Sequence, residues 1–493
     1  MPWDFDMNRS SYSVLPERFF ARLNPAPVAK PQLLKFNHAL ALELQLDIDG
    51  LDAEALAGIF SGNVVPQGVE PLAMAYAGHQ FGHFVPQLGD GRAILLAEAV
   101  DRSGRRRDIQ LKGSGRTPYS RGGDGRAALG PVLREYLVSE AMHAMGIPTT
   151  RALAAVATGE PVFREAALPG AVLTRVAASF VRVGTFQYFA ARDDVDAVRR
   201  LADYVIDRHY PQVKDGQSPY LALLRAVAES QASLVASWMH VGFIHGVMNT
   251  DNMAVSGETI DYGPCAFMDS YDPAAVFSSI DRQGRYAYGH QPHAAVWNLA
   301  RFAETLLPII DADADRAAEL AGETLAVFST RFGDDSLTGM RRKLGLQAQE
   351  EGDAALIEDW LDAMHRNRAD FTLAFRGLCE AAEGEAADPG VGALFANPRD
   401  YDEWAVRWRA RLARDPLDPR ARAAAMRQVN PLFIPRNHRI EQVIEAAVRH
   451  QDFAPFARLS DVLSQPYQAR EGFETYADAP QPDELVRQTF CGT

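Results

Sequence analysis

Two stretches in the first quarter of the chain carry short apolar runs next to glycine turns, and this pattern predicts β-strands. The first stretch, residues 84–100, carries a Gly-Asp-Gly turn between two apolar runs, which predicts a β-hairpin. The second, RRRDIQLKGSG at 105–115, is typical of a strand that ends in glycines. Residues 170–184 are also strand-rich, whereas the stretch near 31–44 is typical of a short helix. A sheet is therefore expected in the N-terminal part.

Apolar residues recur at helical spacing in two longer segments. Residues 130–148 place Leu133 and Leu137 on one stripe, begin with a proline in the first turn and end in Gly-Ile-Pro. Residues 218–243 form a longer apolar stripe, with Gly242 as the expected C-terminal cap. Both segments are predicted to be helices.

Beyond about residue 290 the pattern is mostly helical, with loops expected at 331–337 and 383–400. Strands and one helix thus come first, and a mainly helical body follows. This order predicts an α+β, protein-kinase-like fold with two lobes. The expected lobes are a strand-rich N-terminal lobe over residues 1–185, which binds nucleotide phosphates, and an enlarged, mainly helical C-terminal lobe over 186–493.

Composition narrows the functional classes. The 493 residues are 47% hydrophobic and 23% charged, and the formal net charge of -14 does not favour a nucleic-acid-binding protein. The sequence contains neither a signal-peptide pattern nor an apolar run of the ~18 residues that a membrane span needs. We therefore expect a cytoplasmic protein without a membrane partner. A monomer is expected as well, because no coiled-coil pattern appears.

The segment 243–265, read as a loop and two short strands around a Ser-Gly-Glu turn, carries the most specific chemical signal. His245 and Asn252 are spaced as the first and last residues of the kinase motif H-R-D-L-x-x-x-N, and Asp261-Tyr262-Gly263 follows where a kinase has D-F-G. An amide oxygen at Asn252 and a carboxylate at Asp261 are hard ligands suited to Mg²⁺ that is bound to nucleotide phosphates.

One essential kinase residue is missing from this segment. Val247 stands where a kinase has its catalytic Asp, and a valine cannot accept a proton. Asp251 lies next to Asn252, and its carboxylate could act as a general base in place of that Asp. A third metal ligand or a loop-capping residue is the alternative role for Asp251.

Four residues of the strand-rich part could contact phosphates. Gly89 and Gly91 would let backbone amides approach phosphate oxygens, and Arg92 would add charged donors; an ordinary turn is the alternative. Lys112 ends a strand as the conserved kinase lysine does, and Glu135 on the following helix could pair with it. Taken singly, both could be ordinary surface residues.

Two further groups could bind the nucleotide. The Gly- and Arg-rich insert GSGRTPYSRGGDGRAALG contains Asp124 and Gly125 and is either a flexible linker or a nucleotide-contacting loop. Arg175 and Arg182 could clamp a polyphosphate or lie on the surface. Residues seven apart point to opposite faces of one continuous strand, so a bend must separate these two arginines if they act together.

Three long stretches make the chain resemble the selenoprotein O family, the kinase-like protein adenylyltransferases. They are AGHQFGHFVPQLGDGRA, LKGSGRTPYSRGGDGRA and HGVMNTDNM with DYGPCAFMD. The resemblance covers nearly the whole chain. It implies that ATP binds in an inverted pose and that AMP passes to Ser, Thr or Tyr hydroxyls of proteins, with release of pyrophosphate and with Mg²⁺ or Mn²⁺ as cofactor.

The resemblance also implies a role for each candidate residue. By position, the proton acceptor is Asp251 and the metal ligands are Asn252 and Asp261, the latter also touching the nucleotide. The nucleotide contacts are Gly89, Gly91, Arg92, Lys112, Asp124, Gly125, Arg175 and Arg182.

The family carries a selenocysteine or cysteine near its C-terminus, and here Cys491 occupies that position. Some bacterial relatives resemble a redox switch in which this residue pairs with a Cys just after D-Y-G, which here is Cys265. A reversible Cys265–Cys491 disulfide is therefore one hypothesis, and two unrelated thiols are the alternative.

Other functions stay open at this point. UMP transfer from UTP, phosphate transfer with Asp251 as base, and a nucleotide-binding pseudokinase scaffold are the alternatives. Val247 argues against ordinary phosphate transfer. Retention of Lys112, Asn252 and Asp261 argues against a scaffold, which has no need of metal ligands.

Overall fold

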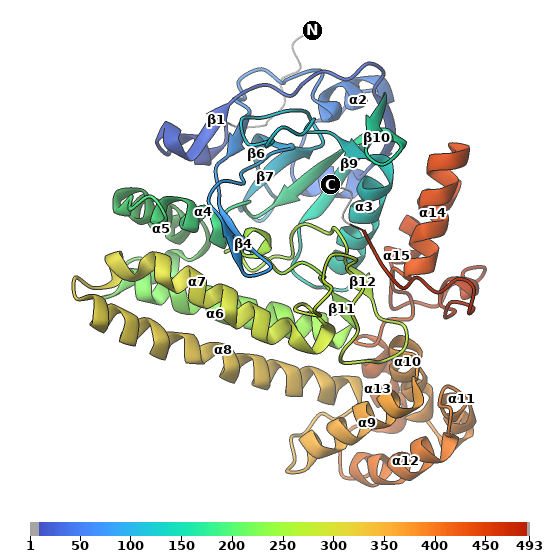
Figure 1. Cartoon of the computed structure of the whole chain (residues 1–493). Coiled ribbons are helices and arrows are strands. Elements are labelled where there is room, and N and C mark those ends of the chain that lie inside the picture. Colours follow the sequence, from blue (N-terminus) through green and yellow to red (C-terminus); the bar gives the residue numbers. More distant parts are fainter. Residues whose placement is uncertain (1–8, 491–493) are drawn as a thin grey trace.

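The computed structural model describes residues 9–490, and its sheet lies in the N-terminal part (Figure 1). The sheet is antiparallel, with the strand order β1-β3-β6-β7-β10-β9-β2, and β8 pairs with β10 beside that path. Its strands are β1 (Phe20–Arg22), β2 (Gln32–Phe36), β3 (Leu72–Met74), β6 (Ala93–Val100), β7 (Arg106–Lys112), β8 (Ala127–Ala128), β9 (Arg151–Phe163) and β10 (Ala167–Ala177).

Successive residues of the central strands point to opposite faces of the sheet, and each face is covered by helices. Leu95 and Leu173 belong to the core beneath α3 (Leu129–Ala144), whereas Leu96 and Val172 pack with α1 (His38–Glu43) and α2 (Ala53–Ser61). Because both faces are buried, the middle of β6 is apolar at nearly every position. This packing explains why the strand lacks strict alternation.

The second part of the chain is helical. Helices α6, α7 and α8 pack side by side below the sheet, and a smaller helical group, α9–α13, lies beyond them (Figure 1). The helices are α4 (Val183–Ala190), α5 (Val195–His209), α6 (Pro219–His240), α7 (Gln291–Ile310), α8 (Ala314–Lys343), α9 (Asp353–Asn367), α10 (Phe371–Ala381), α11 (Asp388–Gly392), α12 (Pro398–Leu412), α13 (Pro419–Arg427), α14 (Asn437–His450) and α15 (Ala454–Leu463). An α+β architecture is therefore confirmed.

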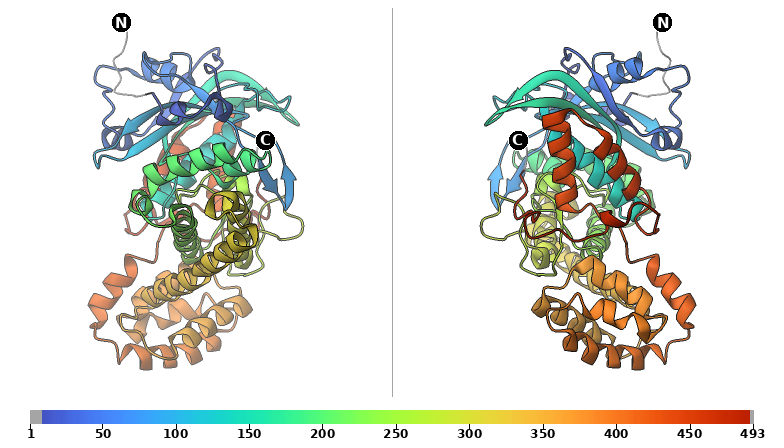
Figure 2. Two further views of the ribbon diagram at one scale, coloured as in Figure 1. Left: turned by 90° about the vertical axis from the view of Figure 1, so that its left-hand side faces the viewer. Right: turned by 90° about the vertical axis from the view of Figure 1, so that its right-hand side faces the viewer.

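Late segments of the chain return to the sheet. Helices α14 and α15 both contact α3, and the views in Figures 1 and 2 agree on this arrangement. The ring of Phe456 on α15 meets that of Tyr136 on α3 at 5.4 Å, and the Tyr467 hydroxyl donates to the Met145 carbonyl (3.1 Å). The elements around residue 450 therefore stabilise the N-terminal half of the molecule.

The two long helix predictions are confirmed. Helices α3 and α6 match the expected segments to within a few residues, and both are followed by glycines in the left-handed conformation, Gly146 (φ 80°) and Gly242 (φ 70°). Glycine adopts this conformation without the steric cost that a Cβ imposes.

The predicted hairpin at 89–91 is wrong. The Asp90 amide donates to the Met74 carbonyl, and the Asp90 carboxylate accepts from the Met74 amide, both at the end of β3. The turn is therefore hydrogen-bonded to the end of β3. Strand β6 pairs with β3 and β7 instead of with residues 84–88.

Three other local predictions need correction. The stretch near 31–44 contains strand β2 before the short helix α1, and the strands expected at either side of the Ser-Gly-Glu turn are only isolated bridges at Ala254 and Thr259. The loop expected at 331–337 is also wrong, because α8 continues through Gly333. A helical glycine costs about 1 kcal/mol relative to alanine. Packing on α6 and the Arg331–Asp335 ion pair (2.7 Å) offset that cost.

At the end of α8, Lys343 is buried within the apolar core of α9–α13. Its ammonium lies 4.2 Å from the ring centre of Phe375 and 5.5 Å from that of Phe371, which offsets part of its lost hydration. Burial nevertheless lowers the pKa of Lys343 to about 7. Its pKa in the folded state is thus below the ordinary value, so its cost to stability is greatest below pH 7 and disappears as the pH rises toward 10.5.

We therefore expect Lys343→Met to raise the melting temperature, with the largest gain at or below pH 7. The gain in free energy of unfolding should be on the order of a few kcal/mol, because one pKa unit corresponds to about 1.4 kcal/mol. Scanning calorimetry of the variant and the wild type at pH 7 and pH 9.5 checks this. Lys214→Met is the control, because the Lys214 side chain is exposed. An equal gain at both pH values would contradict the prediction.

Candidate active site

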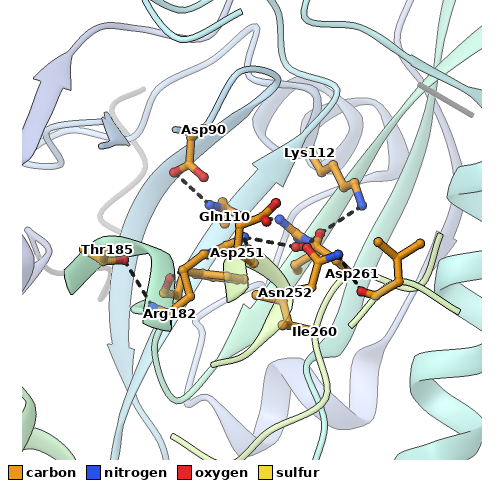
Figure 3. Close-up of polar contacts among 12 residues, drawn as sticks. Asp90, Gln110, Lys112, Arg182, Thr185, Asp251, Asn252, Ile260 and Asp261 are labelled. Carbon is orange, nitrogen blue, oxygen red and sulfur yellow. Dashed lines mark hydrogen bonds and ion pairs between the residues drawn. The ribbon is translucent and has the colours of Figure 1, made fainter. Parts of the chain in front are cut away.

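A cavity of about 730 Å³ lies between the sheet and the loops that follow α6, a size typical of small-ligand sites. It brings together nearly all the residues that the sequence nominated for phosphate, metal and proton chemistry. Those that line it are Gly89, Gly91, Arg92, Lys112, Asp124, Gly125, Arg175, Arg182, Asp251, Asn252 and Asp261. Figure 3 shows the central part of this constellation.

Lys112 and Glu135 form the ion pair expected from the sequence. The Lys112 Nζ atom lies 2.6 Å from Glu135 Oε2, and both side chains are buried. Lys112 ends β7, and Glu135 occupies the middle of α3 on the face turned to the sheet. Because Glu135 holds the ammonium from behind, the amine is fixed at the wall of the cavity.

Asp261 is the centre of the charge cluster. Its Oδ1 lies 3.3 Å from Lys112 Nζ and 2.6 Å from Arg175 Nη1, and its Oδ2 lies 3.0 Å from Arg182 Nη1. Burial alone would raise the pKa of Asp261, but Arg175, Lys112 and Arg182 together hold it well below its ordinary value. The carboxylate is therefore ionised and can bind a cation without first losing a proton.

The backbone at Asp261 is strained. Its φ angle is 63°, in the left-handed region that residues with a Cβ seldom adopt. The Gly263 amide donates to the Asp261 carbonyl (2.9 Å), and His245 Nε2 donates to the carbonyl of Ile260 (2.9 Å). These contacts hold the tight turn that directs the carboxylate at the three cations.

Strand register explains how three of the polar residues share one face. Gln110 and Lys112 are two apart on β7, and Arg175 on β10 pairs with Gln110. The Arg175 guanidinium donates to Gln110 and lies 3.2 Å from Glu135. Residues of adjacent strands that stand opposite each other point to the same side, so all three side chains share one face of the sheet, and Lys112 and Arg175 line the cavity.

Arg182 reaches the same cluster by another route. Strand β10 ends at Ala177, and the chain bends before Arg182 at the start of α4, as the spacing of the two arginines required. Its guanidinium donates to the Asp251 carbonyl (2.9 Å) and lies 4.5 Å from the centre of the Tyr76 ring. Arg182 thus links the Asp251 segment to Tyr76, which lies just after β3.

The short segment at Asp251 and Asn252 follows β11 (Phe243–Ile244), which pairs with β12 (Ala266–Phe267). The side-chain Nδ2 of Asn252 donates to the Val247 carbonyl (2.9 Å). The side-chain oxygen of Asn252 therefore points away from Val247. Asp251 is buried; its Oδ2 accepts from Gln80 Nε2 (3.2 Å), while Oδ1 has no hydrogen-bond partner among the described residues. Burial raises the pKa of Asp251 to about 6.

The outer end of the cavity is formed by glycine-rich turns. A Cβ on Gly89, whose φ is 75°, would lie 2.4 Å from the Tyr119 ring, and one on Gly125, whose φ is 68°, would lie 2.1 Å from the Gly115 carbonyl oxygen. Only glycine fits these positions. Asp124 is half exposed at this end and forms an ion pair with Arg164 (2.9 Å). The hydrogen bonds and the positive charge of Arg164 lower the pKa of Asp124.

Several contributing residues were not found by sequence reasoning. Gln110 donates to the buried carboxylate of Asp90 (3.2 Å), whose pKa burial raises to about 6. A Gln two residues before Lys112 on the same strand face was the available signal. Gln80 lies within the AGHQFGH stretch, but nothing local in that stretch points to Asp251.

Cys265 is buried just after the Asp261 turn and does not line the cavity. Cys491 lies outside the described residues. Thr489, at the end of the described chain, donates from its hydroxyl to the carbonyl of Pro264, which precedes Cys265.

Fixed cations, an ionised carboxylate and a buried carboxylate in one nucleotide-sized cavity indicate a group-transfer enzyme that uses a nucleotide. The class is that of the nucleotidyltransferases. The chain is 62% identical over 484 residues to the protein nucleotidyltransferase YdiU of Rhizobium meliloti (strain 1021), covering 98% of this chain and 99% of the relative. It is 63% identical over 485 residues to the YdiU of Bradyrhizobium sp. (strain BTAi1 / ATCC BAA-1182), with the same coverage.

Within this class the chain belongs to the SelO family. The family model described as protein adenylyltransferase SelO matches residues 7–464. The protein is therefore a nucleotidyltransferase that acts on proteins. Within the described part of the chain, no helix has the length and apolar character needed to cross a membrane.

Proposed function

We propose that the protein transfers AMP from ATP to Ser, Thr or Tyr hydroxyls of other proteins and releases pyrophosphate. The observation that carries this proposal is the buried carboxylate of Asp251, whose Oδ1 is unpartnered among the described residues. It shares one cavity with Val247, which replaces the catalytic Asp of a kinase. The proposal also includes a protein-kinase-like fold with lobes at 1–185 and 186–493. In this fold ATP binds in an inverted pose.

In this proposal, the cation cluster binds the phosphates of ATP. Lys112, Arg175 and Arg182 stabilise negative charge as it grows on the leaving pyrophosphate. Arg92 and the turns at Gly89, Gly91, Asp124 and Gly125 hold the rest of the nucleotide. The fixed ion pairs of Lys112 and Arg175 with Glu135 support this role, because they hold the cations in place before ATP binds.

The residues present fit a divalent cation. Asn252 and Asp261 offer an amide oxygen and an ionised carboxylate, the ligand types that Mg²⁺ and Mn²⁺ prefer. No group of three or more His, Cys, Asp or Glu suited to a metal occurs in the described chain, so phosphate oxygens would supply the other ligands. Bound there, the ion would neutralise phosphate charge.

Asp251 is the proposed general base. Its carboxylate accepts the proton of the acceptor hydroxyl as the hydroxyl oxygen bonds to the α-phosphorus and the bond from that phosphorus to pyrophosphate breaks. A group with a pKa near 6 is a stronger base than an ordinary carboxylate and is still ionised at neutral pH.

ATP labelled separately at the α- and γ-phosphates tests the proposed function. We expect protein-bound label from the α-position only. Label from the γ-position would indicate phosphate transfer, and bound nucleotide without label from either would indicate a scaffold. UMP transfer is the second candidate, because the relatives are named nucleotidyltransferases without a stated base. An assay with UTP labelled at the α-phosphate distinguishes UMP transfer from AMP transfer. A cytoplasmic location and a monomeric state stay predictions.

A reversible Cys265–Cys491 disulfide also stays a proposal. The contacts of Thr489, two residues before Cys491, support it. The Thr489 hydroxyl donates to the carbonyl of Pro264, which precedes Cys265, and the Thr489 amide donates to the Phe277 carbonyl (2.7 Å). We expect oxidant to protect both cysteines from alkylation and reductant to restore them, as peptide mass spectrometry would detect. Cys265 and Cys491 both alkylated after oxidation would contradict the proposal; Cys379, buried on α10, is the internal reference.

A further inference from the structure

The β4–β5 hairpin is formed by part of the AGHQFGH stretch, whose role the proposed chemistry does not explain. Strands β4 (Gly78–Gln80) and β5 (His83–Val85) extend from the sheet toward α7 (Figure 1) and lie on the segment that carries Asp251. The His79 amide donates to Thr250 Oγ1 (2.7 Å), and the Phe81 amide donates to Asn249 Oδ1 (3.0 Å). Each of these contacts joins residues about 170 positions apart in the sequence.

The backbone of the Asp251 segment is fixed from several sides. Thr250 Oγ1 donates to Gln187 Oε1 (2.6 Å), and Gln187 Nε2 donates in turn to His79 Nδ1 (2.8 Å). Arg182 holds the Asp251 carbonyl (2.9 Å). None of these contacts reaches the Asp251 carboxylate, so they fix its backbone and leave the orientation of the carboxylate to another group.

Gln80 is the side chain that contacts this carboxylate. Its Nε2 donates to Asp251 Oδ2 (3.2 Å), and Oδ1 is buried without a partner in the described chain. Gly78, two residues earlier on the same face of β4, lies beside that second oxygen. A Cβ at position 78 would stand 2.7 Å from Oδ1 and 3.0 Å from the Asp251 Cβ. The hairpin thus donates to one oxygen and packs closely against the other.

We propose that Gln80 is a positioning residue for the transfer reaction: it holds Oδ2 of Asp251 and so fixes the orientation of the carboxylate, and Gly78, which lacks a Cβ, lets the carboxylate keep that orientation. This inference rests on the proposed role of Asp251 as general base. A carboxylate free to rotate would present its oxygen correctly only part of the time. Small misplacements of reacting groups can lower rates about 100-fold.

The first test is Gln80→Ala, assayed with ATP labelled at the α-phosphate and with casein as the acceptor. We expect kcat to fall about 10- to 100-fold, while the KM for ATP and the melting temperature stay close to wild type. Gly78→Ala should lower kcat at least as much, because its methyl group would meet Oδ1. The control is His83→Ala, which lies opposite Gln80 in the same hairpin, is exposed and does not line the cavity.

A double-mutant cycle separates positioning from general disruption of the hairpin. In an Asp251→Glu background the carboxylate is already displaced by one methylene, so Gln80→Ala should cost less than about 3-fold. In a Lys112→Met background it should keep its full cost. Equal costs in both backgrounds, or a Gln80→Ala enzyme with wild-type kcat, would overturn the inference.

These outcomes are distinct from failure of the proposed function. If Asp251→Ala kept full activity, the general base itself would be wrong and the role of Gln80 would fall with it. If Asp251→Ala were inactive while both Gln80→Ala and Gly78→Ala were fully active, the base would stand and only this inference would be wrong.

Discussion

Asp251→Asn is expected to lower the rate of transfer of the α-phosphate label about 100- to 10,000-fold, while ATP still binds. The substitution keeps the size of the side chain and an oxygen that can accept from Gln80, but an amide cannot take up the hydroxyl proton. Because the contacts of Lys112, Arg175 and Arg182 with Asp261 do not involve the Asp251 carboxylate, the phosphate-binding cluster should be intact. Initial rates and calorimetric titration with ATP and Mg²⁺ measure the two properties.

Two comparisons make this result specific. Asp251→Ala should behave in the same way, and Asp402→Asn, which removes an exposed carboxylate on α12, should leave the rate unchanged. Full activity of either Asp251 variant would remove Asp251 as the base. Loss of ATP binding together with activity would favour its alternative role as a metal ligand or a structural cap.

Asp261→Asn is expected to abolish transfer for a different reason and also to destabilise the protein. It removes the charge that compensates Lys112, Arg175 and Arg182, and breaking a buried ion pair from one side typically costs about 3–5 kcal/mol. Because the Asp261 side chain is 20% exposed, we expect a loss at the lower end of that range. Thermal unfolding without nucleotide measures it.

The nucleotide dependence of this variant should also be distinctive. By formal charges, the three cations and the two carboxylates of Glu135 and Asp261 sum to about +1, and the substitution raises this net charge to about +2. ATP without metal should therefore bind the variant at least as tightly as wild type, while Mg²⁺ should no longer strengthen binding. Asp261→Asn with normal transfer would contradict the proposed metal site.

Different parts of the site were predictable to different degrees. His245, Asn252 and Asp261 were recognisable because their spacing lies within one short segment, and the turn that joins them is held by contacts between near neighbours such as His245 and Ile260. Lys112 and Glu135 could be nominated because each belongs to an element with a clear local pattern. That they touch depends on how α3 packs on the sheet, which no local pattern encodes.

Errors arose where tertiary contacts outweighed a local signal. The Gly89–Gly91 turn is typical of a hairpin, yet the hydrogen bonds of Asp90 with Met74 attach it to β3. Gly333 is typical of a break, yet packing on α6 keeps α8 helical. Gln80 carried no signal at all, because its partner is 171 residues away.

By itself, therefore, the sequence determined the α+β class of the fold, the approximate limits of α3 and α6, and which residues to nominate for phosphate, metal and proton chemistry. These properties follow from periodicity, from capping glycines and from the chemistry of residues close together in the chain. Only the tertiary structure decided that Lys112, Arg175 and Arg182 converge on one carboxylate and that a distant hairpin contacts the Asp251 carboxylate. Such contacts form when packing joins distant segments, so their geometry depends on the whole fold.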